Sequence, residues 1–223
     1  MGESDFMEAV KAGESERIRS LLQADPALAR ARDSQGVSAV LRALYQGHGE
    51  LAEELAGQVG DLDLFEAAAM GRLQRVRDLA AADGARTAVF SPDGFTPLGL
   101  AAYFGRVATV AWLLEQGVDP NTPAANPSKI APLHAAVAHR GEEASLEIAR
   151  LLLDAGACAD AAQAGGIQPL HAAAAHGRVE LATLLRKRGA SVDNMGDDGR
   201  TALDHARERG QDDMVAFLQK DPD

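Results

Sequence analysis

Residues 96–105 of this chain read TPLGLAAYFG, and two later stretches repeat the pattern in outline: APLHAAVAHRG (131–141) and QPLHAAAAHG (168–177). Their prolines lie 35 and 37 residues apart. A glycine ends each stretch, an apolar run with a Leu-Leu pair follows, and a second glycine closes the unit. Self-similarity at this period indicates a stack of small structural units.

Each unit predicts two short helices joined by a tight turn. Proline is tolerated in the first turn of a helix because its missing N–H would lack a partner there anyway. The alanines allow the first helix to lie close to its neighbours, and the glycine ends it in the left-handed conformation. The leucines supply the apolar stripe of a second helix. The pattern therefore predicts an all-α chain of helix–turn–helix units.

The pattern resembles the ankyrin repeat, whose motif is Thr-Pro-Leu-His followed by two alanines. The resemblance implies an ankyrin-repeat solenoid in which β-hairpin fingers join the helical units. Carrying the phase along the chain predicts a single ankyrin-repeat domain, 1–223, with degenerate units at its ends. The seven expected units are 1–33, 34–60, 61–90, 91–123, 124–160, 161–194 and 195–223. The stretch LLQADPALARARDSQG (21–36) resembles the N-terminal repeat of bacterial ankyrin proteins.

Two units depart from the period. Only 24 residues separate Ala39 from Asp63, the two positions that correspond to the motif proline. We therefore expect the finger near 57–63 to be largely missing, with a short loop and a local change in stacking in its place. The fifth unit has 15 residues from Gly141 to Gly156, against 12 in its neighbours. This difference predicts a longer helix–helix loop around 142–145.

Composition narrows the class of protein. The chain holds 45 alanines but only 4% aromatic residues, which favours thin helical layers over a thick core. Cys158 is the single cysteine, so one chain forms neither an internal disulfide nor a cysteine-based zinc site. The net charge of −11 disfavours nucleic acid as a partner. With no secretion signal and no apolar run of about 18 residues, we expect a cytoplasmic protein that does not bind membranes.

The expected binding surface follows from the resemblance, since fingers and first helices line the concave groove of such a stack. The phase of the repeat selects ten positions that should face this groove. They are Tyr45, Met70, Phe95, Tyr103, Phe104, Ile130, His139, Ile167, His176 and Arg200. Three aromatic residues gather at these positions in the fourth unit. Two interpretations remain open: these residues anchor a partner, or Phe95 and Phe104 fold back over neighbouring fingers.

The six histidines do not predict a metal site. His134 and His139 are five residues apart, as are His171 and His176. Five residues correspond to about 140° around a helix, so neither pair can face one ion. We expect His134 and His171 to bond backbone groups of the turns. We expect Trp112 to pack between helices.

Motifs of three common catalytic or nucleotide-binding sites are absent from the sequence. It contains no Gly-x-Ser-x-Gly elbow, no Walker-type phosphate loop and no His-Glu-x-x-His motif. We therefore predict no catalytic residue, cofactor or metal. The leading hypothesis is a monomeric, non-catalytic protein–protein interaction module that binds a partner protein through the concave groove. The alternatives are a dedicated regulatory subunit or inhibitor of one enzyme, and an enzyme with a groove site at His139 and His176, which would need a deep pocket.

Overall fold

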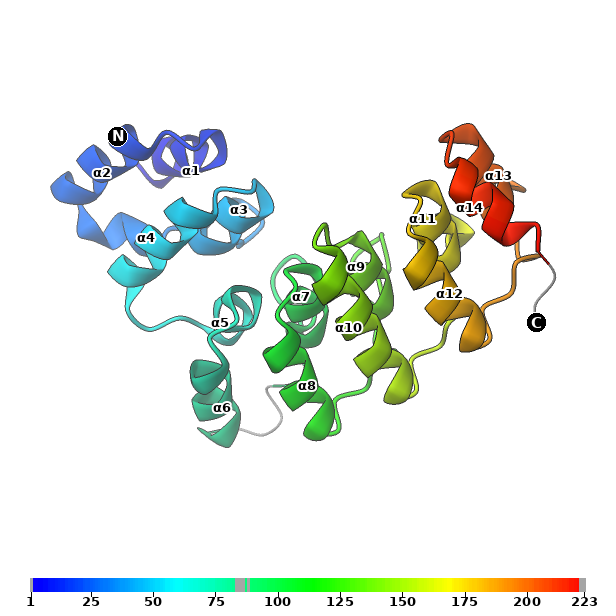
Figure 1. Ribbon diagram of the computed structural model, residues 1–223. Coiled ribbons are helices and arrows are strands. Elements are labelled where there is room, and N and C mark those ends of the chain that lie inside the picture. The colour runs from blue at the N-terminus through cyan, green and yellow to red at the C-terminus, as the bar shows by residue number, and fades with distance from the viewer. Residues whose placement is uncertain (1, 83–86, 88, 221–223) are drawn as a thin grey trace.

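The computed structural model describes residues 2–82, 87 and 89–220 of the chain. Helices follow one another in pairs along a curved row, with the two termini at its opposite ends (Figure 1). The described α-helices are α1 (Glu3–Ala12), α2 (Ser15–Ala24), α3 (Ala39–Tyr45), α4 (Gly49–Val59), α5 (Leu64–Met70), α6 (Leu73–Ala82), α7 (Pro97–Tyr103), α8 (Val107–Glu115), α9 (Pro132–Ala138), α10 (Glu142–Asp154), α11 (Pro169–Ala175), α12 (Val179–Lys187), α13 (Ala202–Glu208) and α14 (Asp212–Leu218). The 3-10 helices η1 (Pro26–Arg30) and η3 (Ala164–Gly166) also lie in connections of the described chain.

The helices form two layers. The first helices of successive pairs, from α1 and α3 through to α13, pack against one another in chain order. The second helices from α6 to α14 form another row, in which each helix again packs on the next. Between α4 and α6 the contact in this outer row is sparse. Contacts therefore run between neighbouring pairs, as in a solenoid.

Small side chains explain how closely the first helices approach one another. Ala102, Ala136 and Ala173, from α7, α9 and α11, have no exposed surface. Leu98, on α7, is also completely buried. Since alanine adds little bulk, the helix backbones can pack closely while the leucines fill the space between the layers. The alanine-rich composition is thus located in the inner row.

Tight turns precede most of the first helices, and we call them finger turns. They span residues 32–38, 91–95, 124–130, 163–167 and 195–201. In one of them, the N–H of Ser91 donates to the carbonyl oxygen of Phe95 at 2.9 Å. The described residues contain isolated bridges but no β-strand, so the β-hairpin fingers implied by the resemblance are not confirmed. The two arms of each turn are too short to form a ladder of repeated hydrogen bonds.

Neighbouring finger turns bond to each other. The N–H of Ala125 donates to the carbonyl oxygen of Gly94 at 2.8 Å, and the N–H of Ala164 donates to that of Ser128 at 3.0 Å. These bonds satisfy backbone groups that a longer hairpin would pair internally. The finger turns therefore form a continuous edge along the fourth to sixth units.

The connection from α4 to α5 contains no finger turn. Helix α4 continues through Gly57 to Val59, and Gly60 then turns the chain with a φ of 72°. Helix α5 begins at Leu64, only four residues later. No hairpin projects from residues 57–63, and residues 60–63 alone connect α4 to α5.

The missing finger changes which units meet. The finger turn at 32–38 lies directly against the finger turn at 91–95, because nothing is inserted between them. A Cβ placed on Gly36 would lie only 2.9 Å from the Cβ of Pro92. Helix α5 still packs between α3 and α7. The second and fourth units are therefore separated by the third at their helices but meet at their finger turns.

The longer loop predicted at 142–145 was wrong. Helix α10 begins at Glu142 and has 13 residues, against nine in both α8 and α12. The extra residues add about one turn of helix instead of a loop. Glu142 and Glu143 favour this start because carboxylates interact well with a helix N-terminus. Ser145 is buried in the added turn and donates to the carbonyl oxygen of Ala136 at 2.7 Å.

Candidate functional site

Four aromatic side chains meet where the second and fourth units touch, and we call them the aromatic cluster: Tyr45, Phe95, Tyr103 and Phe104. Tyr45 ends α3, Phe95 closes a finger turn, and the other two lie at the end of α7. The ring centroid of Tyr45 is 5.6 Å from that of Phe104 and 6.5 Å from those of Phe95 and Tyr103. The rings of Tyr103 and Phe104 meet edge to face at 5.0 Å. Such tilted pairs are favourable for aromatic rings.

The cluster rests on a small aliphatic base. Val37, Leu41, Ala69 and Leu100 are buried beneath the rings. Ala69, from α5, is short enough to let a ring on α3 reach across the third unit to α7. The aromatic rings therefore join α3 to α7 and the finger turn at 91–95, across the third unit.

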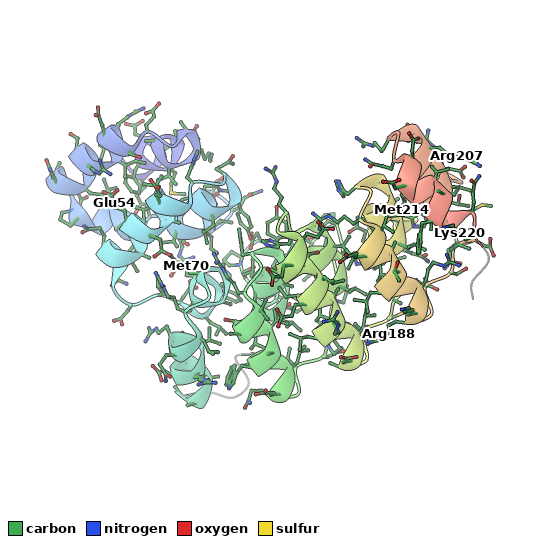
Figure 2. All side chains as sticks on the ribbon, in the orientation of Figure 1. Glu54, Met70, Arg188, Arg207, Met214 and Lys220 are labelled. Atoms are coloured by element: carbon green, nitrogen blue, oxygen red, sulfur yellow. The ribbon has the colours of Figure 1, made fainter. Side chains whose placement is uncertain are left out.

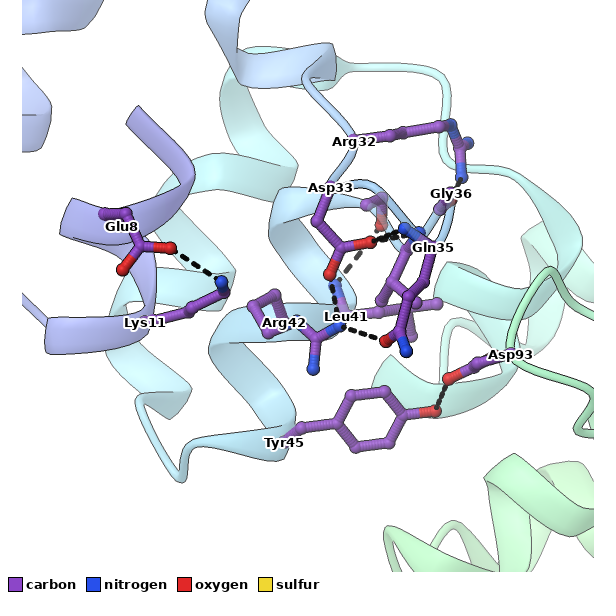
Figure 3. Close-up of polar contacts among 12 residues, drawn as sticks. Glu8, Lys11, Arg32, Asp33, Gln35, Gly36, Leu41, Arg42, Tyr45 and Asp93 are labelled. Carbon is purple, nitrogen blue, oxygen red and sulfur yellow. Dashed lines mark hydrogen bonds and ion pairs between the residues drawn. The ribbon is translucent and has the colours of Figure 1, made fainter. Parts of the chain in front are cut away.

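A hydrogen bond fixes Tyr45 to the fourth unit. Its hydroxyl donates to Oδ2 of Asp93 at 2.8 Å, as Figure 3 shows. Burial, together with the charge of Asp93, raises the pKa of Tyr45 well above its ordinary value. The hydroxyl therefore stays protonated and continues to donate at physiological pH. The other oxygen of Asp93 accepts the hydroxyl of Ser91.

A second polar group lies next to Tyr45 in the same close-up (Figure 3). Arg42 pairs with Asp33, whose Oδ1 accepts the N–H groups of Gln35 at 2.9 Å and Val37 at 3.0 Å. Burial raises the pKa of Asp33, but Arg42 and the two amides outweigh it and hold that pKa below its ordinary value. The pair stiffens the finger turn that bears against the aromatic cluster.

Exposure differs sharply within the cluster. Tyr103 is 42% exposed, whereas Tyr45, Phe95 and Phe104 are half-buried. Tyr45, Phe95 and Phe104 thus pack on one another between the second and fourth units. Tyr103 is the member whose ring is offered to solvent.

Met70 does not belong to an accessible groove. It was expected to face the groove, but its side chain is 5% exposed and packs into the main core at the end of α5 (Figure 2). The prediction was wrong because the core packs around this side chain, while Arg106 of the fourth unit lies over the end of α5 and its Nε bonds the carbonyl oxygen of Ala69 at 2.7 Å.

His139 turns back onto the unit before it. Its Nδ1 lies 3.0 Å from the carbonyl oxygen of Tyr103, and its ring covers Gly105 so closely that a Cβ there would lie 2.4 Å from Nε2. Burial lowers the pKa of His139, and the charges of Arg178 and Arg106 act in the same direction. The ring therefore links the fourth and fifth units and orients the backbone beneath Tyr103.

The remaining predicted positions do not gather with the cluster. Ile130 and Ile167 lie half-buried on successive finger turns, and His176 is exposed at the end of α11. Arg200 is exposed and pairs with Glu208 at 2.7 Å. These residues are spread along the row, as their repeat phase requires.

A depression opens beside the aromatic cluster at the finger edge. It has a volume of about 470 Å³ and is lined by Gln35, Pro92, Asp93, Gly94, Phe95, Ala125 and Asn126. Its walls come from three finger turns that meet because the third unit lacks one. The depression is polar on one side, through Asp93 and Asn126, and apolar on the other, through Phe95.

A family model for ankyrin repeats (3 copies) matches residues 64–163 and 133–223. Together these ranges cover more than half of the chain. The chain belongs to the ankyrin repeat family. Ankyrin repeats are generally protein–protein interaction modules and are typically non-catalytic.

The ankyrin motif histidines act as expected. Nε2 of His134 bonds the carbonyl oxygen of Ile167, and Nε2 of His171 bonds that of Asn194, both at 3.1 Å. Nδ1 of His171 also accepts the N–H of Gln168 at 3.0 Å, so this ring is neutral. Burial lowers the pKa of both histidines, which agrees with a structural role in the ankyrin stack.

Other features of this ankyrin repeat protein bear on its function. Trp112 is partly buried against the core, with the guanidinium of Arg77 6.0 Å from its ring. Within the part of the chain that the structure describes, no three His, Cys, Asp or Glu side chains are grouped to hold a metal ion. None of the described helices is both long and apolar enough to cross a membrane.

The repeat pattern does not single out Asp33, Arg42 or Asp93. An Asp at the start of a finger turn is an ordinary turn residue. Its pairing with an arginine nine positions later follows no repeat rule. Asp93 acquires its role only because Tyr45, 48 residues earlier, reaches it across the third unit.

Proposed function

We propose that this ankyrin repeat protein binds a partner protein through the concave face formed by its finger turns and first helices. The observation that carries the proposal is the exposed ring of Tyr103, held at the edge of the aromatic cluster. Exposed aromatic side chains are enriched among the residues that contribute most to protein–protein binding.

Rigidity supports this assignment. The ring of Tyr103 is packed against Phe104, and the carbonyl oxygen of Tyr103 is bonded by His139. A side chain that is already held in place loses little conformational entropy when a partner binds. Tyr103 can therefore act as an anchor with little loss of conformational entropy.

The proposal extends to the organisation of the molecule. We place the seven units in one ankyrin domain over 1–223 that works as a monomer in the bacterial cytoplasm, without cofactor, membrane or nucleic acid. The net charge of −11 and the lone Cys158 support this setting. A dedicated regulatory subunit or inhibitor of one enzyme would use the same face. The two roles differ in whether binding changes the partner's activity.

A groove enzyme is less well supported. His139 uses Nδ1 to bond the backbone of Tyr103, and among the described residues no carboxylate accepts a hydrogen bond from His139 or His176. General acid–base chemistry needs a base oriented by a second group and held in a concave pocket. The two histidines lie on separate loops without such an arrangement.

Photo-crosslinking tests the proposal. The photoreactive residue p-benzoylphenylalanine would replace Tyr103 in one variant and Glu115, exposed at the end of the outer helix α8, in a matched control. After irradiation in the native cells, we expect one defined protein adduct from position 103 and none from position 115. Tyr103→Ala should then weaken binding of the purified partner at least about tenfold. Equal adducts from both positions, or unchanged affinity, would refute the site.

A further inference from the structure

Asp93 is a half-buried carboxylate that forms no ion pair with any residue of the described part of the chain. Its Oδ2 accepts the hydroxyl of Tyr45 (Figure 3), and its Oδ1 accepts the hydroxyl of Ser91. Arg42, whose charge acts on Tyr45, is already paired with Asp33. The negative charge of Asp93 is therefore held by neutral donors and by water.

The carboxylate can accept a further donor. Each of its oxygens accepts one hydroxyl, whereas a carboxylate oxygen has room for two hydrogen bonds. Opposite charges attract more strongly where protein partly excludes water. The remaining positions of Asp93 therefore suit a cationic group that comes from outside the chain.

The depression at the finger edge gives such a group a shaped site. It has a volume of about 470 Å³, and Asp93 is the one charged residue among those that line it in the described structure. Phe95 and Pro92 supply its apolar wall, and Gln35 and Asn126 add side-chain amides. A planar guanidinium donates from its edge and stacks through its faces, so a carboxylate beside an aromatic ring suits arginine better than the compact ammonium of lysine.

Tyr45 links this depression to the exposed ring of Tyr103. The ring centroids of the two tyrosines are 6.5 Å apart, and the hydroxyl of Tyr45 bonds Asp93. Asp93 and Tyr103 therefore contact the same side chain. A short extended segment, which advances about 3.3 Å per residue, can span both.

We infer that the partner protein inserts an arginine side chain into the depression beside Asp93. The guanidinium donates to the carboxylate of Asp93 and stacks on the apolar wall at Phe95. An apolar side chain a few residues away in the partner packs on Tyr103. This inference rests on the proposed function, since it names the chemistry that the same binding face selects.

Selection from a phage-displayed library of random dodecapeptides tests the inference on the full chain. We expect the enriched peptides to share an arginine at one fixed position, with a Phe, Trp or Leu nearby. Citrulline keeps the shape of arginine but not its charge. A synthetic copy of an enriched peptide with citrulline at that position should therefore bind at least about tenfold more weakly.

Substitution of Asp93 tests which residue receives the arginine. Asp93→Asn should weaken binding of the arginine peptide about tenfold. The same variant should bind the citrulline peptide as the parent chain does, which also shows that it is folded. Asp197→Asn is the matched control, because it removes an exposed carboxylate from another finger turn, and it should change the affinity less than about twofold.

The outcomes separate this inference from the proposed function. Enriched peptides that lack a shared arginine but depend on Tyr103 would overturn the arginine site and leave the binding face intact. Arginine peptides that depend on Asp93 but bind Tyr103→Ala as tightly as the parent chain would support the depression and contradict Tyr103 as an anchor. Peptides indifferent to both substitutions would contradict both proposals. The absence of any enrichment would overturn the arginine site, while crosslinking from position 103 tests the binding face separately.

Discussion

Replacing Tyr45 tests whether one side chain couples the second unit to the fourth. Tyr45→Phe removes only the hydroxyl that donates to Asp93 at 2.8 Å. A hydrogen bond to a charged group contributes about 1.5–3 kcal/mol to stability. Asp93 is only half-buried and keeps the hydroxyl of Ser91 as a donor, so we expect a smaller loss of about 1 kcal/mol.

Tyr45→Ala removes much more. It deletes a ring that contacts Phe95, Tyr103 and Phe104, and it leaves a cavity above the aliphatic base of the cluster. Truncation of a buried aromatic side chain typically costs about 3–5 kcal/mol. Because Tyr45 is half-buried, we expect the lower value of about 3 kcal/mol.

Two probes in one urea titration measure the effect. Trp112 is the single tryptophan and lies in α8, so its fluorescence follows unfolding of the fourth unit, while circular dichroism follows all helices. We expect both probes to give one transition in the parent chain and two separate transitions in Tyr45→Ala, since stability in a repeat stack depends on neighbouring interfaces.

A double-mutant cycle tests whether the bond between Tyr45 and Asp93 couples the two units. Tyr45→Phe and Asp93→Ala should show a coupling free energy of about 1 kcal/mol, because each removes one partner of the same bond. A coupling below about 0.3 kcal/mol, with coincident transitions in Tyr45→Ala, would show that the second and fourth units are not joined through this side chain.

Three further changes can be predicted. Burial and the neighbouring Asp63 raise the pKa of Glu66, so the stability of the fold should fall as pH rises above about 4.5. Glu66→Gln should flatten this pH dependence and raise the melting temperature at pH 7, and a variant with the pH profile of the parent chain would contradict the prediction. Lys129 has a φ of 50° where other finger turns have glycine. Lys129→Gly should therefore raise the free energy of unfolding in urea by about 0.5–1 kcal/mol, and a lower free energy of unfolding would show that the backbone at Lys129 is not strained. Gly105→Ala should lower the free energy of unfolding about 1 kcal/mol more than Gly117→Ala, because both glycines have positive φ but only Gly105 is covered by His139. Equal decreases in the two variants would argue against the contact between His139 and Gly105.

Much of the fold could be predicted from local patterns. Helices α7, α9 and α11 begin at Pro97, Pro132 and Pro169, the motif prolines themselves. His134 and His171 bond backbone groups as expected, because each interaction spans only one repeat interface and recurs with the period. Patterns of this kind depend on nearest neighbours, which the spacing of the repeat already specifies.

The errors have a common cause. The residues at 142–145 lengthen α10, because the outer row leaves space for another turn and nothing in the spacing distinguishes a loop from a helix. Met70 is buried rather than groove-facing, because the core closes around it at the end of α5. In both places the space available to the chain, rather than its local preference, determined the result.

Local sequence patterns predict the paired helices, the alanine-lined inner row and the missing finger between the second and third units. The consequence of the missing finger is visible in the folded stack alone: the finger turns at 32–38 and 91–95 meet, and Tyr45 reaches Asp93. The physical reason is that local periodicity specifies contacts between adjacent units. Removing one finger creates a contact between units that are not adjacent, and which side chains fill that gap depends on the whole stack.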